Sequence, residues 1–296
     1  MENYALFIKF VMPMKKLFFV IILIFISVFL WSADFSFAVL NVGQGLCVVI
    51  QDTTGKVLMY DCGTSDFNDI DFSQNEKVFD RVALPYLKSI NAKAIDIMVL
   101  SHPHTDHFVG LKRAFDFYYV GAFLYNGYNS NNKNYSNLAK TVTSKLQPEI
   151  IYAGQTFKLG KDVNFQVFSP ISGVYYKDPD CNSIVLKVTY KDKTFLLTGD
   201  LDQAAEPLIM EKFGKELQSH VLVCGGHGTK YSSTDKFLNM IKPKYAIISC
   251  GINNPYHLPH EPLLKRLRGI GATIYRTDTQ GNIVFKVKDN QLTKVD

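Results

Sequence analysis

Three histidines and one aspartate lie within six residues of the chain, at His102, His104, Asp106 and His107. Neutral imidazole nitrogens and carboxylate oxygens are ligands that zinc and similar divalent metals prefer. In an extended segment His102 and His104 point to the same side and can bind one ion, while Asp106 and His107 in the following turn can reach a second. The spacing therefore predicts a metal site; the alternative is a solvated loop that is merely rich in histidine.

This cluster follows a largely apolar run, residues 94–100, which predicts a strand that carries the cluster at its carboxyl end. Asp200 ends a second apolar strand at residues 193–198, and His227 follows a third at residues 221–224. Functional side chains gather on loops at the ends of such strands, so we expect these groups to meet. Asp200 is suited to bridge two ions because one carboxylate has two oxygens.

The remaining pattern indicates how these strands are supported. Short β-rich runs separated by glycine turns predict an antiparallel meander at residues 35–60. Helical periodicity over residues 75–90 predicts a helix that Pro85 kinks or splits. Two successive halves of strands and helices follow, with no internal linker or repeat. The sequence thus predicts an α+β fold in which residues 34–296 form one domain of two packed sheets with helices outside.

The N-terminal segment has a different character. Lys15 and Lys16 precede an apolar run at residues 17–31, which is the pattern of a secretory signal. The run is shorter than the roughly 20 residues that cross a bilayer comfortably, yet no A-x-A cleavage site follows it. We expect residues 1–33 to be a cleaved signal peptide, with a retained membrane anchor as the alternative and Met14 as an alternative start. The domain is therefore expected to be exported, as a secreted, periplasmic or membrane-attached protein.

Composition sets wide limits. The chain is 47% apolar and 20% charged, which is typical of a globular rather than a disordered protein. Its net charge of +5 permits an anionic substrate without indicating one. The five cysteines are odd in number, lack C-x-x-C spacing and lie mostly in apolar runs. They are expected to be buried small hydrophobic residues rather than a disulfide framework.

Short motifs follow one another along residues 35–287. They are N-V-G-Q-G at Asn41, D-C-G at Asp61, S-H-P-H-T-D-H at Ser101, N-S-I-V-L at Asn182, T-G-D at Thr198, G-H-G-T at Gly226 and the run from Asn254 to His260. This order resembles the hydrolase domain of the ComEC-type competence proteins, a branch of the metallo-β-lactamase fold. The resemblance implies a four-layer αβ/βα sandwich and a metal-dependent hydrolase, with cleavage of phosphodiester bonds or DNA proposed for the branch. We expect a stand-alone exported relative that lacks the family's transmembrane competence domains.

The resemblance also implies a set of ligands, residue by residue. Many enzymes of this fold have a further histidine at the first ion where this branch tends to have asparagine, which is Asn182 here. An amide is a poorer ligand than an imidazole, so one of the two ions is expected to bind weakly; a plain turn residue is the alternative role of Asn182. The implied metal ligands are His102, His104, Asp106, His107, Asp200 and His227.

The chain departs from the branch at the edges of its motifs. Asn41 and Leu46 stand where the branch usually has aspartates, and Gly226 stands where it has the first of two histidines. The last motif is H-L-P-H, from His257 to His260, rather than G-H-P-H. His257 is expected to replace the displaced histidine, or either His257 or His260 to act as a general acid; surface histidines are the alternative. The departures leave the substrate more open than the metal.

The implied chemistry follows from two divalent ions, zinc or manganese, that share a water molecule and lower its pKa towards about 7. The hydroxide would attack a phosphorus or carbonyl centre, with Asp106 completing the charge balance and Asp61 orienting a ligand imidazole. A strand-terminating turn is the alternative role of Asp61. We therefore expect a phosphodiesterase or nuclease whose partner is nucleic acid, with the membrane as a second partner if the N-terminal segment is retained, and no protein partner.

Two other functions fit the same residues. The fold and the ions could serve to hydrolyse a lactone, thioester or similar small-molecule ester. Alternatively, the chain could be a metal-stabilised surface binding domain without catalysis, because the edges of its motifs are altered. The identity of the metal stays open, since histidine and carboxylate ligands accept zinc, manganese and iron alike.

Overall fold

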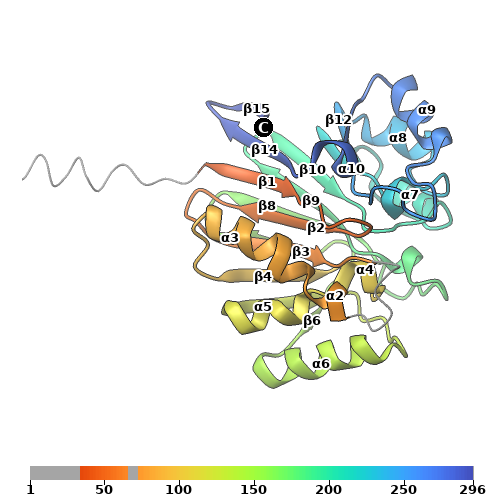
Figure 1. Cartoon of the computed structure of the whole chain (residues 1–296). Helices are drawn as coiled ribbons and strands as arrows, with labels where there is room; N and C mark the ends of the chain where they lie inside the picture. The colour runs from red at the N-terminus through yellow and green to blue at the C-terminus, as the bar shows by residue number, and fades with distance from the viewer. Residues whose placement is uncertain (1–33, 66–72, 296) are drawn as a thin grey trace, which may run out of the picture. The chain divides into compact units, whose positions relative to one another are not determined.

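Two β-sheets face each other in the computed structural model, which describes residues 34–65 and 73–295 (Figure 1). The first sheet has the strand order β15-β14-β1-β2-β3-β4-β5-β6. It is antiparallel from β15 to β3 and parallel from β3 to β6, so the predicted meander over residues 35–60 is confirmed. Its strands are β1 (Phe35–Val39), β2 (Cys47–Gln51), β3 (Val57–Cys62), β4 (Ile95–Leu100), β5 (Val120–Tyr125), β6 (Glu149–Ile150), β14 (Ile283–Lys288) and β15 (Gln291–Val295).

The second sheet has the order β13-β12-β11-β10-β9-β8-β7. Here β10 to β13 run parallel and β7 to β10 run antiparallel. We did not predict β7, an edge strand of four residues that is largely exposed although Phe157 and Leu159 alternate with polar residues in it. Its strands are β7 (Thr156–Leu159), β8 (Val163–Ser169), β9 (Val185–Tyr190), β10 (Lys193–Leu197), β11 (Val221–Val223), β12 (Tyr245–Ile248) and β13 (Thr273–Arg276).

Aromatic side chains fill the space between the two sheets. Phe35 of β1 stacks on Tyr190 of β9, and Phe37 stacks on Phe195 of β10, each pair with ring centroids 4.4 Å apart. Alternate residues of these strands point inward and are fully buried, which is the period-two pattern of a strand with one face in a core. The core between the sheets therefore fixes the register of the strands that lead to the site.

Helices cover the outer face of each sheet (Figure 1). The predicted helix at residues 75–90 is split, and Pro85 lies in the first turn of α3. Helix α6 begins after Asn132, whose side chain accepts hydrogen bonds from the amides of Asn134 and Tyr135 and caps it. The helices on the first sheet are α2 (Ser73–Glu76), a π-turn (Phe79–Ala83), α3 (Leu84–Ser89), α4 (Thr105–Phe108), α5 (Leu111–Phe117) and α6 (Lys133–Lys145).

The second sheet has its own helical layer. It consists of α7 (Glu206–Phe213), α8 (Asp235–Ile241) and α9 (Glu261–Gly269), with short 3₁₀ turns at Asp180–Asn182, Gly214–Leu217 and Gly226–Gly228 and the single-turn α10 (Thr277–Gln280). Apolar residues of α7, α8 and α9 pack on the outer face of this sheet. The predicted sandwich of two sheets with outer helices is thus confirmed.

Two other predictions concern the N-terminal segment and the cysteines. No helix among the described residues is long and apolar enough to cross a membrane. The predicted signal or anchor at residues 1–33 lies outside the described residues. The five cysteines are buried and none forms a disulfide, as the sequence predicted.

Candidate metal centre

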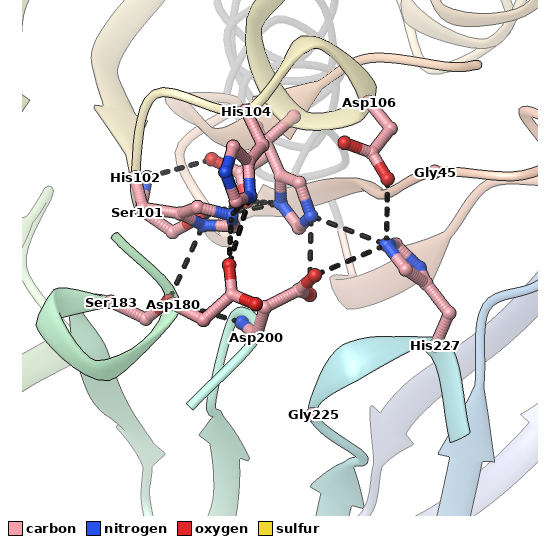
Figure 2. A network of polar contacts seen from close by, with 12 residues as sticks. Gly45, Ser101, His102, His104, Asp106, Asp180, Ser183, Asp200, Gly225 and His227 are labelled. Atoms are coloured by element: carbon pink, nitrogen blue, oxygen red, sulfur yellow. Dashed lines mark hydrogen bonds and ion pairs between the residues drawn. The ribbon is translucent and has the colours of Figure 1, made fainter. Parts of the chain in front are cut away.

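The carboxyl ends of parallel strands carry the candidate site. Strand β4 ends at Leu100, and the chain turns through Ser101 and His102 into α4, for which His104 is the N-terminal cap residue. The amide of His107 donates to the carbonyl of His104, which turns Asp106 and His107 back towards the strand end. A strand followed at once by a helical turn therefore carries all four predicted ligands at the strand end, and Figure 2 shows His102, His104 and Asp106 on this turn.

His102, His104 and Asp180 form a first cluster. His102 Nε2 lies 3.1 Å from His104 Nδ1, and Asp180 Oδ1 lies 3.3 Å from the former and 2.9 Å from the latter. The three ligand atoms are close enough together to hold one ion. Sequence reasoning missed Asp180; its signal was an acidic D-P-D run directly before the strand that contains the N-S-I-V-L motif.

Asn182 has the second of the two roles considered for it, that of a turn residue. Its side-chain amide donates to the carbonyls of Tyr176 and Asp178, and its Oδ1 accepts from the amide of Tyr176. These bonds hold the loop that presents Asp180, and Asn182 itself belongs to neither cluster of candidate ligands.

Asp106, His107, Asp200 and His227 form a second cluster, to which β10 and β11 each contribute a residue just beyond their carboxyl ends. His107 Nε2 lies 3.1 Å from Asp200 Oδ1, and His227 Nε2 lies 3.2 Å from Asp106 Oδ2 and 3.5 Å from Asp200 Oδ2. Segments far apart in sequence are thereby brought together, as the sequence predicted for Asp200 and His227.

The two clusters adjoin. The rings of His102 and His107 are 4.2 Å apart, and the negative charge of Asp200 acts on His102 of one cluster as well as on His107 and His227 of the other. Figure 2 shows the Asp200 carboxylate beside both clusters. This position suits the bridging role that was expected of Asp200.

Asp61 holds the second cluster from behind. Its carboxylate is fully buried, accepts from the amide and hydroxyl of Ser101 at 2.7 Å each, and lies 2.8 Å from His107 Nδ1. Because the carboxylate only accepts, His107 Nδ1 carries the proton and Nε2 faces the cluster. The structure places Asp61 where a residue that orients a ligand imidazole must lie.

The G-H-G-T turn holds His227 in the same way. His227 has φ 53°, between Gly226 at φ 56° and Gly228 at φ 88°, so three consecutive residues are left-handed. Its Nδ1 donates to the carbonyl of Ser249 at 3.0 Å, which leaves Nε2 for the cluster. A Cβ on Gly226 would come within 2.5 Å of Thr229 Cγ2, so glycine, not the branch's usual histidine, suits this turn.

The donor set fits divalent ions. His107 Nε2 and His227 Nε2 lie 3.3 Å apart, and both point a lone pair at the same space because each Nδ1 carries the proton. One buried carboxylate oxygen in each cluster, Asp180 Oδ1 or Asp200 Oδ1, meets ring nitrogens of the cluster histidines and has no other hydrogen-bond partner among the described residues. A cation between these nitrogens and oxygens would be bound by both.

Electrostatics agree with this interpretation. Burial lowers the pKa of His107, but the Asp200 and Asp61 carboxylates raise it more, and the net pKa is well above its ordinary value. Burial raises the pKa of Asp106, but His227 and His107 lower it more, to about 2. The clusters therefore keep their carboxylates ionised and attract positive charge, either protons or metal ions.

A hollow of about 460 Å³ opens over both clusters. His104, Asp106, Asp180, Asp200 and His227 line it together with Asp202 and several uncharged residues; no lysine or arginine of the described chain does. The polar loop at residues 126–134 supports the segments that carry the clusters. The Asn126 side chain donates to the Asn182 carbonyl, and the Asn132 side chain donates to the Thr105 hydroxyl.

His257 and His260 lie elsewhere, contrary to the role expected of them. His257, at φ 55°, lines a neighbouring hollow with Asn253 and Arg276. His260 Nδ1 accepts from the amide of Lys230 at 3.0 Å and so supports the loop that follows His227. Neither ring lines the hollow over the clusters.

Two facing sheets with outer helices, and histidine and aspartate clusters at the ends of their parallel strands, define a metallo-β-lactamase fold. Residues 40–252 match the metallo-beta-lactamase superfamily, and the chain belongs to it. The metallo-beta-lactamase fold protein YhfI of Bacillus subtilis has a TM-score of 0.55 with this chain at 13% identity, over 86% of this chain and 100% of that one. At such low identity the likeness concerns the fold alone.

Within the superfamily, the chain is similar to ComEC-type competence proteins. ComE operon protein 3 of Bacillus subtilis (strain 168) is 29% identical over 267 residues, which cover 87% of this chain and 34% of that protein. Competence protein ComA of Neisseria gonorrhoeae is 32% identical over 246 residues, which cover 83% of this chain and 31% of that protein. The chain thus spans about a third of the length of the curated relatives it matches.

Proposed function

We propose that this protein is a metal-dependent hydrolase that cleaves phosphodiester bonds, with DNA as its substrate. The observation that carries the proposal is the pair of adjoining clusters with Asp200 between them, which together can hold two ions below an open hollow. Similarity to competence proteins favours DNA over a small-molecule ester. Export of the domain through residues 1–33 is part of the same proposal.

His102, His104 and Asp180 would hold the first ion, Asp106, His107 and His227 the second, and Asp200 both. Two ions so held would supply hydroxide near neutral pH and stabilise the charge on the phosphoryl oxygens. Asp61 and the Ser249 carbonyl keep the ligand nitrogens of His107 and His227 turned towards the hollow.

The charge of the hollow makes substrate binding depend on the ions. Its lining includes four carboxylates, those of Asp106, Asp180, Asp200 and Asp202, and no lysine or arginine among the described residues. Two divalent ions balance these four charges. A labelled oligonucleotide should therefore bind in manganese or zinc and dissociate when a chelator is added.

The deciding experiment incubates the purified protein with plasmid DNA and manganese or zinc. Asp106→Ala removes a ligand of the second cluster and should abolish cleavage. Asp116→Asn is the matched control, because Asp116 is an exposed carboxylate on α5 that pairs with Arg113. Equal cleavage by the Asp106→Ala variant and the parent would end the nuclease assignment.

A parallel assay with a chromogenic carboxylic ester separates the two enzymatic alternatives. A nuclease should cleave the plasmid and leave the ester largely intact. Ester cleavage without DNA cleavage would move the substrate to a small molecule while keeping the metal chemistry. Absence of both activities in protein loaded with two ions would favour a binding domain.

A further inference from the structure

Gln44 lies in the glycine turn between β1 and β2 and lines the hollow over the clusters. It is only 4% exposed. Its side-chain oxygen Oε1 accepts from the amide of Gly251 at 3.1 Å, and its backbone carbonyl accepts from the amide of Ser65 at 2.6 Å. These contacts tie the turn after β1 to the loop after β12.

The contact with Gly251 also settles which way the side-chain amide faces. A backbone N–H can only donate, so the atom of Gln44 that meets it must be the oxygen. The nitrogen Nε2 is therefore the atom that this contact leaves available, on a side chain that lines the hollow. An amide N–H group at the wall of a hollow can donate to a molecule bound there.

The turn that carries Gln44 is held rigidly. A Cβ on Gly45 would lie 2.3 Å from the carbonyl oxygen of Gly63 and 2.7 Å from that of Asp106, so this backbone packs directly against the metal-binding turn. A Cβ on Gly251 would lie 2.8 Å from the amide nitrogen of Gln44. Side chains are excluded on both sides, and the position of Gln44 relative to Asp106 is fixed by backbone contacts.

We propose that Gln44 Nε2 donates a hydrogen bond to a charged phosphoryl oxygen of the substrate in the hollow. The inference rests on the proposed phosphodiester hydrolysis, because Gln44 would bind a phosphoryl oxygen of the substrate that the two metal ions do not bind. Four carboxylates line the same space, so a neutral, preorganised donor adds stabilisation without a competing charge.

The donor should matter more when charge develops than when substrate first binds. Removing one preorganised donor from an active site lowers kcat by roughly 10²-fold to 10³-fold. Because Nε2 is one of several groups around the reacting oxygens, we expect kcat to fall on the order of 10²-fold in Gln44→Met, with a smaller change in KM. Metal content should stay unchanged, since Gln44 belongs to neither cluster.

Binding of inorganic phosphate to the metal-loaded full chain provides a test that needs no turnover. A hydrogen bond to a charged group corresponds to about a tenfold or larger change in affinity. Gln44→Met should weaken phosphate binding by about that factor. Gln51→Met is the matched control, because Gln51 is a glutamine of similar burial, at 6% exposed, whose Nε2 donates to the Ile90 carbonyl away from the hollow.

The outcomes separate the two proposals. If phosphate binds the parent and the control but binds Gln44→Met more weakly, the donor role stands, whether or not the plasmid is cleaved. If the parent cleaves DNA and Gln44→Met matches it in kcat and in phosphate affinity, the donor role is wrong and the nuclease assignment remains. Failure of the metal-loaded parent to bind phosphate would also remove the donor role.

Discussion

The two clusters adjoin but hold their histidines differently. In the second cluster His107 and His227 are 0% and 6% exposed, and each gives its Nδ1 proton to a fixed acceptor, the Asp61 carboxylate or the Ser249 carbonyl. In the first cluster His102 Nδ1 meets only the hydroxyls of Ser101 and Ser183, at 3.0 and 3.3 Å. The His104 side chain is 45% exposed.

This contrast indicates that the two clusters bind their ions with different affinities. Acceptors behind a ligand histidine fix its tautomer and raise its basicity, and so strengthen metal binding. We infer that the second cluster is the preorganised and tighter site, while the first is the open site from which an ion exchanges more readily. The weak ion that the sequence predicted from Asn182 is thus expected for another reason, the loose support of the first cluster.

The largest effect is expected from Asp200→Ala, because this carboxylate contacts the second cluster and acts on the first. Metal content should fall from about two ions per chain to less than one, and any hydrolytic activity should be lost. Elemental analysis of the purified variant measures this directly. Two ions retained per chain would mean that the clusters are independent.

Replacing the acceptor behind His107 should affect the second cluster more than the first. Asp61→Asn is expected to weaken the second ion by roughly 10-fold to 100-fold and the first by less, because Asp61 reaches His102 only through the Ser101 hydroxyl. Ser183→Ala, which removes a hydroxyl behind His102, should have a smaller effect on the first ion. Competition titration with a chromophoric chelator resolves the two affinities, and equal losses in both variants would contradict the contrast drawn here.

The loop that carries Asp180 offers a sharper comparison within the first cluster. Asp180→Asn should weaken the first ion and destabilise the chelated protein less than Asn182→Ala does, because the Asp180 side chain pairs with His102 and His104 but bonds no backbone group of the loop. Asn182→Ala should destabilise even the chelated protein by about 1–3 kcal/mol, since it leaves partly buried backbone groups of the loop unpaired. Urea unfolding of both chelated variants tests this; a stable Asn182→Ala variant would return Asn182 to the list of ligand candidates.

The smallest effect concerns pH in the chelated protein. The pKa of His107 is raised well above its ordinary value of 6.5, so its contribution to stability is complete below pH 6.5 and is lost as the pH rises through the folded-state pKa. The pKa of Asp106 is lowered from 3.8 to about 2, so its contribution is present above pH 3.8 and is lost on acidification. Tm should therefore be highest between these limits.

Metal-loaded protein should behave in the opposite way at high pH, because binding requires unprotonated imidazoles and releases protons. The difference in Tm between loaded and chelated samples should widen as the pH rises above 6.5. Thermal scans in both states at several pH values provide the measurement. A constant difference would show that the His107 proton is not displaced by the ion.

Much of this site could be predicted from local sequence patterns. The H-P-H-T-D-H spacing, the T-G-D ending of β10 and the G-H-G-T turn after β11 are chemical groups at strand ends, and strand ends are visible in a sequence as the point where an apolar run stops. Asp61 was found in the same way. The edge strand β7 was missed because it has only four residues, too few for the alternation of Phe157 and Leu159 with polar residues to mark a strand clearly.

Residues that act through loops were harder to place. Asn182 and Asp180 are two positions apart, and only the path of the loop decides which of them faces the histidines. Contacts with other segments likewise place His257, which lies in a left-handed turn, and His260, which accepts from the Lys230 amide. No local sequence pattern shows these contacts, so the sequence could not test the general-acid role predicted for the two histidines.

The sequence by itself determined the kinds of ligand, their strand-end positions and the two-sheet architecture, because these depend on local periodicity and on the chemistry of single residues. Only the tertiary structure decided that Asp180 completes the first cluster, that the Ser249 carbonyl orients His227 and that Gln44 lines the hollow with its side-chain oxygen bound to the Gly251 amide. Each of these depends on the meeting of segments tens to hundreds of residues apart, whose relative positions are set by packing between the sheets.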